Sequence, residues 1–153
     1  MPPATRPKSE ECNCLAVRQA ARHVTQFYDQ YLAPVGLRTT QFSILAKLSR
    51  RGPMTINALA RDLVMDRTTL GRNILPLERE GLIAIVKGSS DRRSKELRLT
   101  ETGAVRFRAA VEGWAQAQAR FEAVFGGERA AQLRALLQAV AASDFAADPG
   151  GTP

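Results

Sequence analysis

Apolar residues recur at steps of three and four along most of this 153-residue chain, which is the spacing of one face of an α-helix. The first such series comprises Cys14, Val17, Ala21, Val24, Tyr28 and Tyr31. It predicts a long amphipathic helix that ends near Pro34 and Gly36, because proline interrupts a helix and glycine favours its end. A second helix is expected from an N-cap at Thr39 or Thr40 to the break at Arg51-Gly52-Pro53.

Two shorter helices follow, and each begins at a residue that can cap it. Thr55 is the candidate N-cap of a helix that reaches to about residue 63, and Asp66 is that of a helix that ends at Gly81. Met65 before the second cap and Leu70 after it have the spacing of a hydrophobic staple. The sequence therefore predicts two capped helices joined by a tight break.

The pattern then changes to that of strands. Residues 82–87 and 95–99 read as a β-hairpin, because turn-forming residues separate them at Gly88-Ser89-Ser90-Asp91. Thr100 is expected to cap a long fifth helix, which Gly126-Gly127 end. A sixth, alanine-rich helix is expected to turn inward its residues Leu133, Leu136, Leu137 and Val140. The predicted fold class is mostly α with a small β-hairpin, a winged helix-turn-helix flanked by long terminal helices.

The helix after Asp66 has a polar face that suits the major groove of DNA. When Leu70, Ile74 and Leu77 face the core, a rotation of about 100° per residue turns Thr68 and Arg72 outward. Hydroxyl, carboxamide and guanidinium groups are the side chains that reach base edges and phosphates. The candidate groove contacts are Arg67, Thr68, Thr69, Arg72 and Asn73.

The hairpin places four cations within nine residues. They are Lys87, Arg92, Arg93 and Lys95. An arginine at the end of a hairpin can enter the narrow minor groove, where the potential is most negative. Asp91 is expected to pair with a wing arginine and to fix its direction. The alternative is that these charges only protect a strand edge from aggregation; the capped helix pair just before the hairpin favours the DNA interpretation.

The charge of the chain is unevenly distributed. The net charge is +7, and residues 1–98 carry 17 Lys or Arg against 9 Asp or Glu, whereas residues 99–153 carry 5 against 6. A basic half suits a polyanion such as double-stranded DNA. No apolar run is long enough to span a bilayer, and no hydrophobic segment follows the first charges, so a cytoplasmic location without membrane contact is expected.

Other chemistry has little support in the sequence. Two cysteines and one histidine are too few for a structural zinc site, so no metal is expected. No phosphate-binding glycine loop, paired catalytic carboxylates or histidine triad is recognisable, so neither a cofactor nor an enzymatic activity is expected.

These motifs together resemble the MarR family of bacterial transcriptional regulators. The resembling segments are residues 55–60, 66–70, 77–83, the wing signature Asp91-Arg92-Arg93, and residues 97–103. The resemblance implies a homodimer that binds inverted-repeat operators, usually as a repressor released by a small molecule or an oxidant. It also implies that Thr68, Thr69, Arg72 and Asn73 face the major groove, with Arg93 in the minor groove and Arg92 beside it.

The resulting organisation has three parts. Residues 1–11 are expected to be a disordered arm, residues 12–145 the regulator, and residues 146–153 a disordered tail. Within the regulator, residues 39–99 form the DNA-binding lobe, and residues 12–33 and 101–145 form dimerisation helices. The apolar seams of these helices are too long for one thin domain to bury alone, which favours a homodimer.

Two parts of the chain are candidates for sensing a signal. Cys14 lies near the start of the first helix, where a neighbouring Arg18 and the helix N-terminus could favour the thiolate of a peroxide sensor. The other candidate is a site for a small aromatic or phenolic effector between the dimerisation helices and the lobe. Its candidate contacts are Arg18, His23, Phe42 and Trp114. A third hypothesis makes the chain a winged-helix module that recruits another protein and does not bind DNA.

Overall fold

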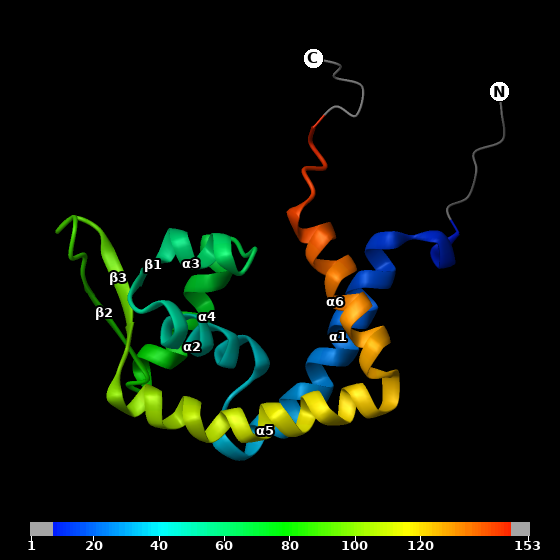
Figure 1. The fold of residues 1–153 in the computed structure, drawn as a ribbon. Helices are drawn as coiled ribbons and strands as arrows, with labels where there is room; N and C mark the ends of the chain where they lie inside the picture. Colours follow the sequence, from blue (N-terminus) through cyan, green and yellow to red (C-terminus); the bar gives the residue numbers. More distant parts are fainter. Residues whose placement is uncertain (1–7, 148–153) are drawn as a thin grey trace.

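The computed structural model describes residues 8–147, and these residues form the mostly helical fold with a small sheet that the pattern predicts. The helical elements are η1 (Ser9–Glu11), α1 (Asn13–Leu32), η2 (Ala33–Val35), α2 (Thr39–Arg51), α3 (Ile56–Asp62), α4 (Arg67–Arg79), α5 (Glu101–Phe125) and α6 (Gly127–Ala142). The strands are β1 (Met54–Thr55), β2 (Ile83–Lys87) and β3 (Lys95–Leu99). Figure 1 shows a lobe of α2, α3, α4 and the sheet at one end of α5, with α6 at the other end.

The start of α2 differs from the expected one. Thr39 is the first helical residue rather than the cap, and the N-cap is Arg38, whose backbone N–H donates to Gln41 Oε1 at 3.0 Å. The Thr39 side chain instead donates to Asp29 Oδ1 of α1 at 2.7 Å. A threonine expected to cap its own helix therefore joins two helices, because α1 brings a carboxylate to it.

The expected N-terminal arm is partly ordered. Residues 9–11, assigned to a disordered segment, form the short 3₁₀ helix η1, and Cys12 caps α1 through its sulfur. Residues 1–7, and residues 148–153 of the expected tail, lie outside the described residues.

A third strand, which the sequence pattern did not indicate, completes the sheet. The strand order is β1-β3-β2, and Met54 of β1 pairs with Leu97 of β3. A two-residue strand carries no readable alternation, so only pairing across the fold reveals it. Leu97 is fully buried at this position together with Leu59, Leu70 and Leu82, so the sheet closes the core of the lobe.

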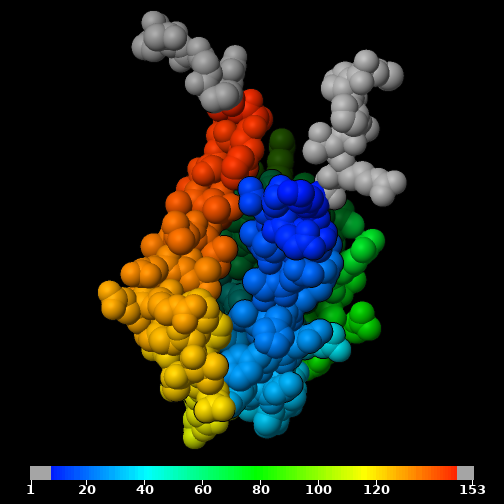
Figure 2. Space-filling model, turned by 90° about the vertical axis from the view of Figure 1, so that its right-hand side faces the viewer, coloured from blue at the N-terminus to red at the C-terminus, as the bar shows by residue number. Residues whose placement is uncertain are grey.

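Helix α6 does not have the buried face expected of it. Leu136, Leu137 and Val140 are 66%, 43% and 46% exposed, Leu133 is half-buried, and Ala130 is the buried residue of the helix. The expectation of an inward face is therefore wrong within a single chain for Leu136, Leu137 and Val140, because α6 packs mainly against α5 and only in part. Figure 2 shows this face of the molecule, with α1 in blue beside α6 in orange.

Candidate nucleic-acid interface

Helices α3 and α4 form a helix-turn-helix whose two caps are those that the sequence predicts. Thr55 Oγ1 accepts the backbone N–H of Ala58 at 3.1 Å, and Asp66 Oδ1 accepts that of Thr69 at 2.8 Å. Hydrogen bonds from Thr69 hold the pKa of Asp66 below its ordinary value, so this cap is anionic at neutral pH. Val64 in the turn adopts a φ of +51°, a left-handed conformation that strains a β-branched residue. The turn is therefore closely constrained.

The outward face of α4 presents Thr68 and Arg72 to solvent, as expected, while Leu70, Ile74 and Leu77 are buried. Leu75, which sequence reasoning missed, is 51% exposed on the same face. The signal was available, because Leu75 follows Thr68 by seven residues, or about two turns. The face thus combines hydrogen-bonding groups with one apolar side chain that can touch a thymine methyl group.

Two other expected groove residues are engaged within α4 itself. The Thr69 hydroxyl donates to Asp66 Oδ2 at 2.6 Å, so it can only accept a further hydrogen bond. Asn73 is half-buried, and its Nδ2 donates to the carbonyl oxygen of Thr69 at 2.9 Å. Arg67 is exposed at the first turn of the helix. Of the five expected groove residues, those whose side chains make no hydrogen bond or ion pair among the described residues are therefore Arg67, Thr68 and Arg72.

The hairpin β2–β3 exposes all four of its expected cations, Lys87, Arg92, Arg93 and Lys95. The expectation that Asp91 pairs with a wing arginine is wrong: its Oδ1 instead accepts the backbone N–H of Arg93 at 2.9 Å. A side-chain contact to the backbone two residues later is a tight local turn. Asp91 consequently fixes the backbone at the tip of the hairpin and leaves the arginine side chains to solvent.

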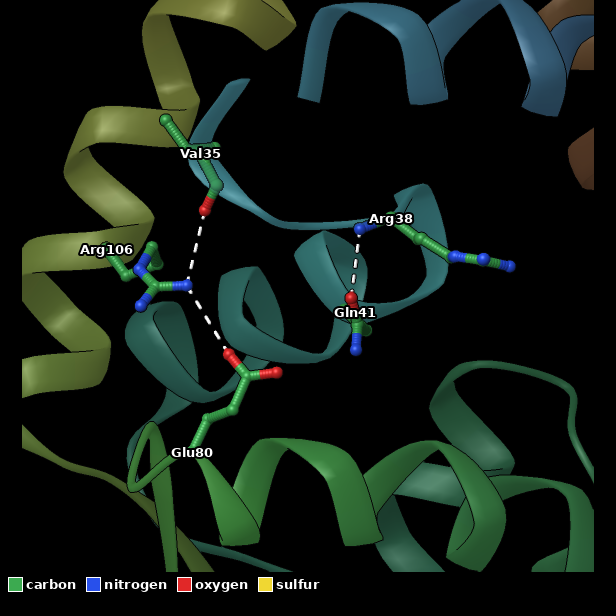
Figure 3. Close-up of polar contacts among 5 residues, drawn as sticks. All are labelled: Val35, Arg38, Gln41, Glu80 and Arg106. Carbon is green, nitrogen blue, oxygen red and sulfur yellow. Dashed lines mark hydrogen bonds and ion pairs between the residues drawn. The ribbon is translucent and has the colours of Figure 1, made fainter. Parts of the chain in front are cut away.

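A polar recess lies beside α4 and was not indicated by the sequence. It has a volume of about 360 Å³ and brings Arg38, the N-cap of α2, and Gln41 of α2 next to Asn73 and Pro76 of α4. Figure 3 shows the Arg38 side chain extending away from the contact between its backbone and Gln41. Since these residues are distant in sequence, only the packing of α2 against α4 brings a further cation, Arg38, to the flank of α4. Helix α4 is the recognition helix of the helix-turn-helix.

The candidate effector residues lie in two different cavities. Phe42 and Trp114 line one of about 530 Å³ between α1, α2 and α5, where their rings stack 6.2 Å apart. His23 lines another, of about 460 Å³, between α1 and the end of α5. Arg18 is exposed on α1, as is Cys14. The structure therefore does not bring the predicted set together at one site.

Other chemistry is not apparent in the part of the chain that the structure describes. Residues 8–147 contain no group of three or more histidine, cysteine or acidic side chains placed to hold a metal ion. No helix among the same residues is both long and apolar enough to cross a membrane.

A capped helix pair, an exposed recognition helix and a basic hairpin on one lobe define a winged helix-turn-helix protein. The sequence model of the MarR family matches residues 37–95, which span this lobe. The chain belongs to the MarR family, whose members are DNA-binding transcriptional regulators and not enzymes.

Three relatives illustrate this membership. The chain is 30% identical to the regulator PecS of Dickeya dadantii, over 71% of this chain and 68% of PecS. It is 38% identical to the transcriptional activatory protein BadR of Rhodopseudomonas palustris, although the match spans only 44% of this chain and 41% of BadR. A crystal structure of the M. tuberculosis regulator MosR in complex with DNA is 38% identical, with a TM-score of 0.73, over 85% of this chain and 96% of that one.

Proposed function

We propose that this chain binds an inverted-repeat operator as a homodimer and represses transcription there until a small effector releases it. Thr68, Thr69 and Arg72 would read base edges in the major groove, with Arg67 and Asn73 at its sides. Arg93 would enter the minor groove with Arg92 beside it, and Lys87 and Lys95 would meet phosphates. The observation that carries this proposal is the exposed row of Thr68 and Arg72 on a helix whose opposite face is buried.

The charge around this row supports a nucleic-acid partner. No carboxylate follows the Asp66 cap until Glu78, so the N-terminal half of α4 presents only neutral and cationic groups. The wing adds cations whose side chains make no ion pair with the acidic residues described. A similar chain, MosR, has been crystallised with DNA. A surface of this kind gains affinity by releasing the counterions of phosphates.

The helices outside the lobe support a homodimer. Besides the three exposed side chains of α6, Val17 of α1 and Val124 of α5 are 44% and 70% exposed. Large apolar side chains left exposed on three helices of one chain favour association, and two-fold assembly is the commonest way to bury them. Two lobes related in this way match the two halves of an inverted repeat.

Selection of bound fragments from random duplex DNA tests this function. We expect enrichment of an inverted repeat whose half-site centres lie about 10–10.5 bp apart, or a multiple of this distance. Expression from a reporter with this site should then rise when the gene for the chain is deleted. A fall would make the chain an activator, as the name of BadR describes that relative. Recovery of no duplex, together with no shift of its own promoter, would favour a module that binds protein.

The cavity that Phe42 and Trp114 line is the proposed site of an aromatic or phenolic effector. Polar groups around it already have partners: the Tyr28 hydroxyl donates to Gln118 Oε1 at 2.5 Å, and Lys47 Nζ lies 3.0 Å from Asp62 Oδ2. Burial and the nearby Glu122 raise the pKa of Tyr28, so its hydroxyl stays neutral. With its cation already paired, the cavity favours a neutral aromatic ring over an acidic one.

Trp114, the one tryptophan of the chain, gives this site its own optical probe. Titration with a panel of phenols and aromatic acids should change tryptophan fluorescence over the same concentrations that release the dimer from DNA. His23→Gln, in the other cavity, should leave the release curve unchanged and serves as the control. Release without any fluorescence change would place the effector elsewhere.

A further inference from the structure

The segment that directly follows the recognition helix α4, residues 80–82, is attached to the N-cap and the first turns of α5. The Thr100 hydroxyl donates to the carbonyl oxygen of Gly81 at 2.6 Å, and the Thr100 backbone N–H donates to that of Leu82 at 3.1 Å. A Cβ on Gly103 would overlap the Leu82 carbonyl oxygen, so glycine permits a close approach there. Since the spacing of three residues repeats along one helix face, Arg106 is the next side chain in this row.

Arg106 extends the attachment to a third segment. Its Nη1 donates to the carbonyl oxygen of Val35 at 3.2 Å and lies 3.4 Å from Glu80 Oε2, as Figure 3 shows. Val35 belongs to η2, which connects α1 to α2, and Glu80 is the C-cap of α4. One guanidinium group therefore joins α5, the α1–α2 connection and the end of the recognition helix.

The charges at the end of α4 favour this contact with Arg106. The C-terminal end of a helix carries a partial negative charge, so the carboxylate of Glu80 is unfavourably placed there. The guanidinium group of Arg106, which extends from α5, offsets the negative charge of both the helix end and the Glu80 carboxylate. The Arg106 side chain is 34% exposed and that of Glu80 is 46% exposed, so solvent screens the ion pair, and the hydrogen bond to the Val35 carbonyl oxygen fixes the direction of the guanidinium group.

We propose that Arg106 is a positioning residue that sets the angle of the recognition helix to α5, and thereby the half-site spacing that the dimer accepts. This inference rests on the proposed function, because spacing matters only to a dimer on an inverted repeat. One base pair added between half-sites rotates them by about 34–36° relative to each other. A rigid joint cannot follow that rotation, whereas a loosened joint can.

Spacing variants of the selected operator test this role. Three duplexes are compared by fluorescence anisotropy: the inverted repeat recovered by the wild-type chain, and the same repeat with one base pair inserted or removed between its halves. For the wild type we expect a loss of about tenfold or more in affinity at either altered spacing. For Arg106→Gln we expect about threefold weaker binding than the wild type at the recovered spacing. The further loss of affinity of this variant at either altered spacing should be only about threefold.

Two further variants separate positioning from folding. Glu80→Gln removes the ion pair but leaves the Val35 hydrogen bond, so we expect the same change in smaller size. Arg108→Ala removes an exposed cation from the same helix and should keep the wild-type spacing profile. Thermal unfolding of each dimer shows whether its fold is retained.

The outcomes are distinct. Equal losses for Arg106→Gln on all three duplexes, or a wild-type spacing profile for both Arg106→Gln and Glu80→Gln, would overturn the inference and leave the DNA-binding function intact. If the wild-type chain recovers no duplex at all, the proposed function fails and the role of Arg106 fails with it.

Discussion

The chain with Leu136→Glu should run as a monomer and bind the inverted repeat about 10²–10⁴-fold more weakly than the wild type, because the second half-site contact is no longer intramolecular. Leu136 is 66% exposed in the single chain, so the substitution removes little packing within one subunit. In the proposed dimer it would bury an unpaired carboxylate, which is strongly unfavourable. Light scattering coupled to size exclusion gives the mass, and anisotropy gives the affinity.

The matched control is Gln138→Glu, which adds the same charge to an exposed position of α6. Successive residues of a helix differ by about 100°, so Gln138 lies well away from the direction of Leu136. We expect this variant to keep the wild-type mass and affinity. If Leu136→Glu also keeps both, α6 does not contribute to the interface and the proposed dimer is wrong in its geometry.

Arg72→Ala should lower the preference of the chain for its operator over random duplex by about 5- to 150-fold, the equivalent of ~1–3 kcal/mol for one bidentate contact to a base. Arg72 is exposed on the face of α4 whose other side is buried, so its loss leaves the core untouched. Affinity for operator and for random duplex is measured at several salt concentrations. The slope of affinity against salt should change little, since a base contact releases few counterions.

Arg93→Ala provides the comparison within the same surface. Its position at the hairpin tip predicts weaker binding to both duplexes by similar factors and a shallower salt dependence, because in the proposed complex its charge would lie in the minor groove between phosphates. Equal losses on operator and random duplex for Arg72→Ala would contradict the base-reading role of Arg72. An unchanged salt slope for Arg93→Ala would contradict the minor-groove role of Arg93.

The predicted effector residues are divided between two cavities. Phe42 and Trp114 were expected at one site and do stack across one cavity, since both lie on the apolar faces of helices that pack together. His23 was expected with them and lines a different cavity, because α1 is long enough to pass both. The length and the apolar face of a helix can be predicted from the sequence, but the segment that packs against each of its turns cannot.

The main helices, the two hairpin strands, three helix caps and the direction of the α4 side chains follow from local sequence patterns. Thr55, Asp66 and Thr100 were identified because a cap is a contact between residues three positions apart. Tertiary structure alone decided the pairing of β1, the attachment of Thr39 to Asp29, the exposure of α6 and the joint at Arg106. Each of these depends on which distant segments pack together, and local periodicity carries no information about that choice.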